Sequence, residues 1–229
     1  MKKLLSLLLG VVLLSSCTFR VNNRGGQEVS VLRSAHPFNR IEIRGLCNVK
    51  YEQGENFSVK IVGDEELVNQ LLTECDGTTL SIKAKDHSVN ITGLRHKRKP
   101  VVYVTSPDLI GIHMEGAGDF EVEKPLDTDT LNVYLKGAGD IDLKRIVCDE
   151  AYINLQGMGD VNVDGLTAKR SVINLKGIGD VDIDFIDSGS AVCTLQGVGD
   201  ISLSGNLKSL QKRVSGTGDI NLNDLRLGQ

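Results

Sequence analysis

The chain has 229 residues, of which 40% are hydrophobic, 24% are charged and only 4% are aromatic, with 25 glycines and no tryptophan. This composition fits a folded globular protein better than a disordered or collagen-like chain. The formal net charge of −4 lacks the basic excess of a general nucleic-acid-binding protein, so we expect no nucleic-acid partner.

The first 17 residues carry a targeting signal. Lys2 and Lys3 precede an apolar run from Leu4 to Leu14 that is too short to span a bilayer comfortably. The run ends on Leu-Ser-Ser-Cys17, which resembles the lipobox of a bacterial lipoprotein signal. The resemblance implies a signal peptide over 1–16, acylation of Cys17 and a lipid-anchored envelope protein, in the outer membrane. An ordinary signal peptide with a chance cysteine is the alternative.

Residues 17–37 show no clear hydrophobic period, and we interpret them as a tether between lipid and domain. No acidic run of the kind associated with surface export of lipoproteins follows Cys17. Its absence weakly favours the periplasmic side of the membrane over the cell surface.

The N-terminal part of the predicted domain (38–222), residues 38–104, is degenerate, and its repeat pattern is weaker than that of the residues that follow. Residues 41–49 look like an imperfect copy of a repeat found further on, with Cys47 and Asn48 in place of a glycine and an aspartate. The sequence predicts strands at 57–61, 80–82 and 101–104. Between them, Asp64 is expected to cap a helix over 64–74 that has acidic residues in its first turn.

The tetrapeptide Gly-x-Gly-Asp occurs six times in 105–222, and its aspartates advance by 21, 20, 20, 20 and 19 residues. A near-constant period of this length is typical of stacked repeats. The glycines, interpreted as structural corners, are Gly116, Gly118, Gly137, Gly139, Gly157, Gly159, Gly177, Gly179, Gly197, Gly199, Gly216 and Gly218. The aspartates are Asp119, Asp140, Asp160, Asp180, Asp200 and Asp219.

Both flanks of each tetrapeptide alternate apolar and polar residues, as a strand with one buried face does. Each unit is therefore predicted to consist of a strand, a glycine corner, a second strand and a polar return segment. We predict an all-β protein, a right-handed parallel β-helix (β-solenoid) with ~20-residue rungs and one short N-terminal helix. The mostly apolar residue between the two glycines is expected to point inward, and 223–229 form a C-terminal tail. An antiparallel sandwich is the competing fold.

These motifs resemble a known family. The pattern Ile41-x-Ile-x-Gly45-x-x-x-Val49, the expected helix near Asp64–Glu74 and the serial Gly-x-Gly-Asp-hydrophobic rungs are similar to the head GIN domain of putative auto-transporter adhesins. The resemblance covers about residues 38–222 and implies a β-helical fold and an adhesin-like role. It supplies no catalytic or ligand-binding residues. The departure at Cys47 and Asn48 concerns the first corner alone.

Two chemistries compete with a purely structural interpretation of the repeat. Parallel β-helices include polysaccharide-active enzymes, but their sites need unlike residues that converge where the repeat breaks, and here the aspartates are alike in every rung. The six aspartates are also the candidate ligands of a calcium-binding solenoid. We favour the alternative that each carboxylate accepts N–H bonds within its own corner, and we expect neither metal nor cofactor.

Three further features bear on partners. The basic cluster Arg95–Lys99 is either a solvated loop or a contact for anionic headgroups. Cys47, Cys75, Cys148 and Cys193 match no metal or redox spacing, and we expect buried thiols without bridges. Lys212 occupies an inward strand position in the last rung, where a charge discourages further strand pairing. The sequence therefore predicts a non-catalytic, lipid-anchored adhesin or scaffold, bound to the membrane through Cys17 and to an unknown envelope protein or glycan.

Overall fold

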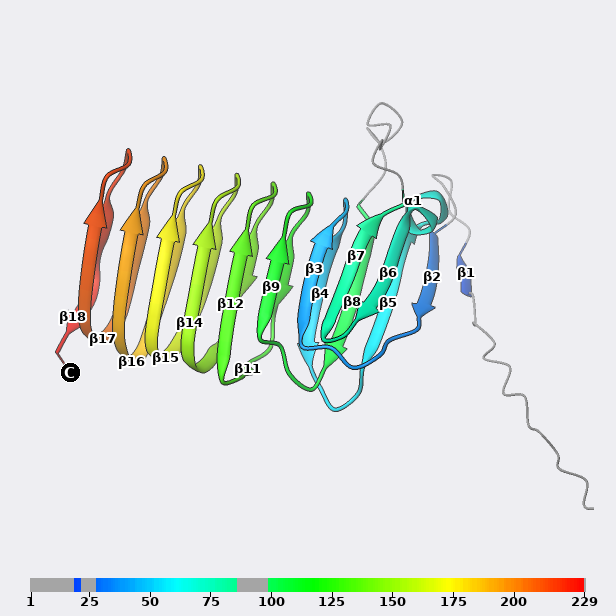
Figure 1. Ribbon diagram of the computed structural model, residues 1–229, viewed down its shortest axis with the longest axis horizontal. Coiled ribbons are helices and arrows are strands. Elements are labelled where there is room, and N and C mark those ends of the chain that lie inside the picture. The colour runs from blue at the N-terminus through cyan, green and yellow to red at the C-terminus, as the bar shows by residue number, and fades with distance from the viewer. Residues whose placement is uncertain (1–18, 22–27, 86–98, 229) are drawn as a thin grey trace, which may run out of the picture.

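The structure, a computed structural model, describes residues 19–21, 28–85 and 99–228. It is an elongated coil of stacked strands with an irregular cap at the N-terminal end (Figure 1). The cap and first rung comprise β1 (Phe19–Val21), β2 (Glu28–Arg33), β3 (Arg40–Arg44), β4 (Asn48–Gln53), β5 (Ser58–Asp64), α1 (Glu65–Gln70), β6 (Leu71–Asp76), β7 (Thr79–Ala84) and β8 (Val101–Ser106).

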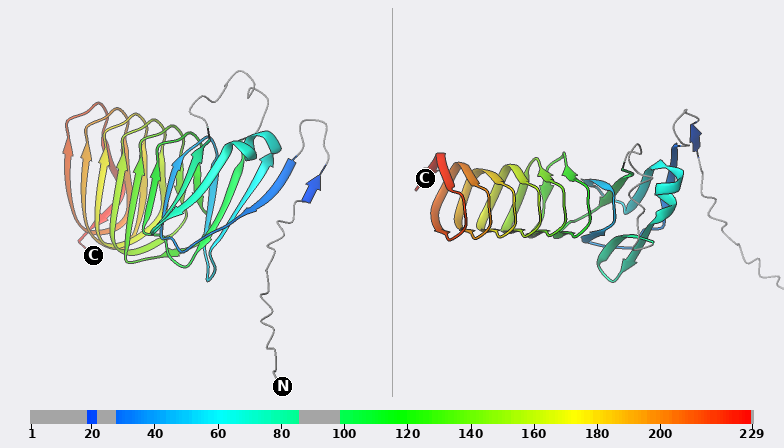
Figure 2. Two further views of the ribbon diagram at one scale, coloured as in Figure 1. Left: turned by 45° about the vertical axis from the view of Figure 1, so that its right-hand side comes forward. Right: turned by 90° about the horizontal axis from the view of Figure 1, so that it is seen from above.

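The rest of the chain winds into the solenoid, seen from above in Figure 2. Its strands are β9 (Gly111–Met114), β10 (Phe120–Val122), β11 (Leu126–Asp127), β12 (Thr130–Leu135), β13 (Ile141–Leu143), β14 (Ile146–Leu155), β15 (Val161–Leu175), β16 (Val181–Leu195), β17 (Ile201–Val214) and β18 (Ile220–Leu227). Parallel pairing places Val161 beside Val181 and Val181 beside Ile201, one repeat apart. The prediction of an all-β solenoid with rungs of about 20 residues is confirmed.

The rungs pack their alternating apolar residues into one continuous core. Val133, Ile153, Ile173 and Cys193 are buried and follow one another along the solenoid axis in parallel register. The expected polar return is instead a third wall, because β14 to β17 bend and continue as strand. Its inward residues are also buried, among them Leu166 and Phe185. Three walls enclose more apolar surface than two, and this burial is the main source of stability.

The degenerate copy at 41–49 is confirmed as the first rung. β3 pairs in parallel with β9, β4 pairs in parallel with β10, and Leu46 forms the bridge that the residue between the two glycines makes in later rungs. Asn48 also takes the place of the aspartate, because its side-chain oxygen accepts the Asp119 N–H at 3.2 Å.

The residue between the two glycines points outward, so the expectation of an inward side chain is wrong. Met158, Ile178 and Val198 expose 59%, 57% and 50% of their surface. The Ile178 N–H donates to Gly157 and its carbonyl accepts from Gly159, so both of its backbone groups lie along the solenoid axis. At the convex side of a turn, the remaining direction for the side chain is solvent.

The expected helix over 64–74 is shorter than predicted. Asp64 does cap it by accepting the Glu66 N–H, but α1 ends at Gln70. Leu71 and Leu72 instead begin β6, which pairs antiparallel with β7 through a turn at Gly77. Backbone pairing within this hairpin overrides the local helical pattern. In the described residues, no helix is long and apolar enough to cross a membrane.

Both ends of the domain extend beyond their predicted limits. β2 lies within the expected tether, yet it pairs antiparallel with β5 and buries Val29. β18 continues to Leu227, so most of the expected tail is a strand. Neither segment contains a repeat motif. β2 is ordered by pairing with β5, and β18 is ordered by pairing with the preceding rung, at β17.

We predict that Gly179→Ala strongly destabilises the fold. Gly179 has a φ of +138°, and an added Cβ would lie 2.0 Å from the Gly159 carbonyl oxygen. The change should lower the free energy of unfolding by about 3 kcal/mol or more, because neither backbone can move without breaking rung pairing.

Urea denaturation followed by circular dichroism measures the effect, with Gly77→Ala as the matched control. Gly77 also has a positive φ, +59°, but a Cβ there would have no neighbour within 4 Å. Its replacement should cost only about 1 kcal/mol. Equal losses in the two variants would contradict the close-packing argument.

Candidate functional site

A groove lies where the cap meets the solenoid, on the outer face of β7, β3, β9 and β12. Its volume is about 630 Å³. Alternation along each strand produces it: Glu42, His113 and Tyr134 point outward, while the residues on either side of each point into the core. Parallel register then aligns these three side chains in one row across the strands.

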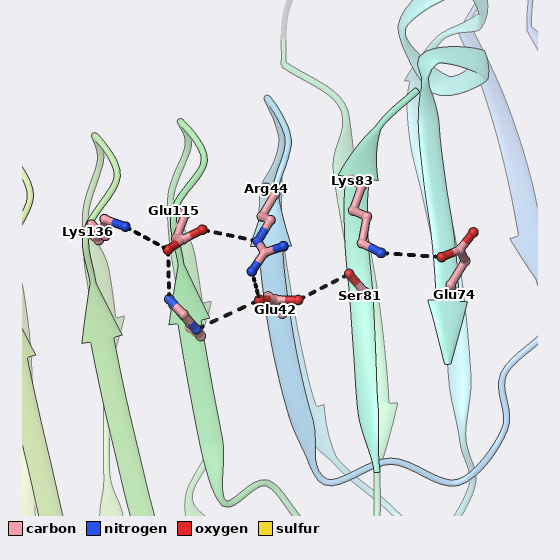
Figure 3. A network of polar contacts seen from close by, with 8 residues as sticks. Glu42, Arg44, Glu74, Ser81, Lys83, Glu115 and Lys136 are labelled. Carbon is pink, nitrogen blue, oxygen red and sulfur yellow. Dashed lines mark hydrogen bonds and ion pairs between the residues drawn. The ribbon is translucent and has the colours of Figure 1, made fainter. Parts of the chain in front are cut away.

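An ion-pair network lies beside the groove and reaches it through Glu42 (Figure 3). Arg44 contacts Glu42 at 2.6 Å and Glu115 at 3.1 Å, and Lys136 contacts Glu115 at 3.1 Å. The hydrogen bond from Lys136 is the main cause that lowers the pKa of Glu115 below its usual value. The Glu115 carboxylate is therefore ionised at neutral pH and holds the cations around it in place.

The floor carries an aromatic pair. The His113 and Tyr134 rings meet edge to face, with their centroids 4.7 Å apart. The Tyr134 hydroxyl donates to Gln156 at 2.8 Å, which fixes the orientation of the ring. His113 Nε2 lies 3.5 Å from a Glu115 oxygen without forming a hydrogen bond. The pair is a rigid, partly apolar surface beside polar groups, a combination suited to binding an amphipathic ligand.

The remaining lining is polar and balanced in charge. Arg40 and Lys83 are opposed by Glu42 and Asp76, and hydroxyl and amide groups come from Thr79, Ser81 and Asn132. Ser81 donates to Glu42 at 3.4 Å, and Lys83 contacts Glu74 at 3.4 Å. The groove thus offers hydrogen-bond donors and acceptors, both charged and neutral, and its positive and negative charges balance.

The repeated aspartates lie elsewhere, along the corners, where they connect one rung to the next. The Asp180 carboxylate accepts the Asp200 N–H at 2.7 Å, and the Asp180 N–H donates to Asp160 at 2.8 Å. Asp140 and Asp200 accept in the same way from the rung that follows each. The expectation of bonds within one corner is wrong in this respect, since the donor belongs to the following rung. In the described part of the chain, no three His, Cys, Asp or Glu side chains are grouped to hold a metal.

A family model described as "Putative auto-transporter adhesin, head GIN domain" matches residues 37–221. The chain belongs to this family. The match runs from before β3 into the start of β18 and includes the groove and all six Gly-x-Gly-Asp corners. No curated protein matches the chain.

Solved structures share the fold of this head GIN domain. A putative adhesin from Bacteroides fragilis is 24% identical, with a TM-score of 0.71 over 85% of this chain and 96% of that one. A putative adhesin from Parabacteroides merdae is 19% identical, with a TM-score of 0.66 over 88% and 98%. A putative lipid binding protein from Parabacteroides distasonis is 17% identical, with a TM-score of 0.53 over 91% and 99%.

The four cysteines of the head GIN domain at 47, 75, 148 and 193 are free thiols. Cys47, Cys148 and Cys193 are buried as predicted, whereas Cys75 is only partly buried, so the expectation of a buried thiol is wrong there. Burial raises the pKa of Cys47 and Cys193 to about 12 and that of Cys148 to about 11. These three thiols stay protonated at neutral pH and are poor nucleophiles. Cys17 and residues 95–98 of the basic cluster lie outside the described residues.

The groove itself was missed by sequence reasoning. Alternation marks Glu42, His113 and Tyr134 as outward, but more than 90 residues separate the first from the last. These three residues meet through the parallel register of β3, β9 and β12. The β6–β7 hairpin completes the groove, and the helix predicted over 64–74 covers most of β6. The one available signal was the imperfect first repeat, which marks where the regular coil ends.

We predict that Asp180→Asn has little effect on the free energy of unfolding, whereas Asp180→Ala lowers it. The amide oxygen of Asn can still accept the Asp200 N–H, whereas Ala leaves that donor unpaired. The alanine variant should lose about 1–3 kcal/mol of unfolding free energy. Thermal melts with and without calcium or a chelator provide the check, and we expect no change with either. A large drop in melting temperature with chelator, reversed by calcium, would show that cations bind the aspartates.

Proposed function

We propose that this head GIN domain is a non-catalytic, lipid-anchored binding module of the cell envelope, and that the groove between cap and solenoid holds its ligand. The family description as adhesins supports a binding role. The lipobox-like Leu-Ser-Ser-Cys17 junction supports the anchor. The observation that carries the proposal is the groove, in which a rigid aromatic pair borders polar groups of balanced charge.

A hydroxyl-rich glycan is the ligand class that this lining fits best. Sugar hydroxyls both donate and accept, and the groove presents a guanidinium at Arg40, a carboxylate at Asp76 and an amide at Asn132. A polyanion would need an excess of cations, which the opposed charges do not provide. The Tyr134 ring supplies the apolar surface on which one face of a sugar can pack.

An enzymatic role receives less support from the same residues. General acid catalysis at neutral pH requires a carboxyl group with a raised pKa, whereas the pKa of Glu115 is lowered by Lys136. Glu42 is held in an ion pair with Arg44 at 2.6 Å. The calcium alternative also weakens, because oxygens of the repeated aspartates accept backbone N–H groups.

The lipid anchor predicts that Cys17→Ala abolishes acylation. Cells grown with a fatty-acid analogue should label the wild-type protein and leave the variant unlabelled. Ser16→Thr serves as the control, because it changes the junction and retains the cysteine. Labelling of the Cys17→Ala variant at wild-type intensity would refute the assignment.

The groove predicts that Tyr134→Ala weakens glycan binding by roughly tenfold or more, because it removes the packing surface. Tyr134→Phe should retain most of the affinity, since the ring remains. An array of bacterial and host oligosaccharides identifies the ligand, and calorimetry then measures its affinity. Tyr103→Ala is the control, because Tyr103 is 39% exposed and lies outside the groove. Equal binding by wild type and Tyr134→Ala would place the ligand elsewhere.

A further inference from the structure

The C-terminal end of the solenoid presents an unpaired strand edge. Residues 209–214 of β17 pair on one side with β16. β18 pairs with β17 only between Ile201 and Leu207, so it leaves this half of β17 uncovered. Among the described strands, none pairs with the other side of 209–214. We call this segment, Ser209–Val214, the terminal edge; it lies at the opposite end of the coil from the cap (Figure 1).

The backbone of the terminal edge has free hydrogen-bonding groups. The Ser215 N–H donates to the Leu195 carbonyl of β16 at 2.8 Å. In a parallel ladder, the backbone groups of successive residues point alternately to the two sides of the strand. The N–H and C=O groups of Leu210, Lys212 and Val214 therefore point away from β16 and are available to another strand.

The terminal edge carries two basic side chains, Lys212 and Arg213, and Lys208 directly precedes it. Lys212 is exposed, although its neighbour in register, Cys193, is fully buried. Within the described residues, no acidic side chain pairs with Lys208, Lys212 or Arg213. Six other lysines do form ion pairs with acidic side chains: Lys50, Lys83, Lys124, Lys136, Lys144 and Lys169.

We propose that the terminal edge binds an extended acidic polypeptide segment, which adds to the sheet as one more strand. Main-chain hydrogen bonds to Leu210, Lys212 and Val214 provide the pairing, and carboxylates opposite Lys212 and Arg213 provide the selectivity. Apolar residues of the partner lie over Leu210, which already packs against the core, and over the 47% exposed Val214. The partner is thus a strand in which acidic and apolar residues are interleaved.

A second copy of this chain is a poor occupant of the same edge. Two terminal edges that paired with one another would bring Lys208, Lys212 and Arg213 of both copies together, and like charges on adjacent strands repel. The last rung has two acidic side chains, Asp219 at the corner and Asp224 on β18, and both lie outside the terminal edge. The same charges that oppose self-association therefore favour an acidic partner. This site is separate from the glycan groove and does not depend on it.

Fluorescence anisotropy with the full mature chain tests the proposal. The probe is a labelled peptide of about ten residues that has adjacent Glu residues to lie opposite Lys212 and Arg213, Val to lie opposite Leu210 and Val214, and Thr elsewhere; the comparison peptide has Lys in place of Glu. We expect the Glu peptide to bind and the Lys peptide not to bind. Lys212→Glu combined with Arg213→Glu should weaken binding by roughly tenfold or more. Lys176→Glu is the matched control, since Lys176 is exposed on a corner of an internal rung, and it should bind like wild type.

A variant that removes a backbone hydrogen-bond donor distinguishes strand addition from simple charge attraction. Val214→Pro keeps every charge and removes an N–H that points to the open side, so it should retain the melting temperature and weaken binding by roughly tenfold. If that variant fails to fold, methylation of alternate backbone nitrogens in the peptide makes the same test with wild-type protein. Binding that survives both changes would overturn the proposal in favour of a site for polyanions. Light scattering that shows a wild-type dimer dissociated by Lys212→Glu would overturn it in favour of self-association.

Discussion

The approach of one backbone to the next at the glycine corners is the contact on which the rest of this structure depends. In each corner the two glycines lie so close to the preceding rung that an added Cβ would come within 1.8–2.2 Å of a carbonyl oxygen. This closeness lets the residue between them bridge to its counterparts in adjacent rungs. Because every corner has the same geometry, the strands on both sides remain in register, and their inward residues form one core.

Uniform corners leave the outer faces free to vary. Rows of outward residues carry no packing constraint, so Glu42, His113 and Tyr134 can differ although they are neighbours in register. The groove occurs where the coil stops being regular, because the β6–β7 hairpin continues the sheet beyond the first rung. The terminal edge occurs at the other end, where β18 covers only half of the preceding strand. Both proposed binding sites are therefore consequences of how the solenoid begins and ends.

Three parts of the structure differ from the sequence prediction, and the differences have a common physical origin. The pattern around Leu71 and Leu72 fits a helix, but long-range pairing with β7 places both residues in a strand. β2 has no repeat motif, yet pairing with β5 orders it. Met158 and Ile178 are apolar and were expected to be buried, but the corner is convex and directs them to solvent. In each case a nonlocal backbone constraint outweighed a local preference.

The sequence by itself determined the regular part of this protein. Period and alternation specify the rung length, the strands and their buried faces, because each rung repeats the same local interactions with its neighbour. The likeness to the head GIN family followed from the same motifs. Only the tertiary structure decided which unlike residues meet: Arg44 with Glu115, Tyr134 with His113, and an uncovered Lys212 at the last edge. These contacts depend on the register between strands and on how the stack of rungs begins and ends, and the sequence of a single repeat specifies neither.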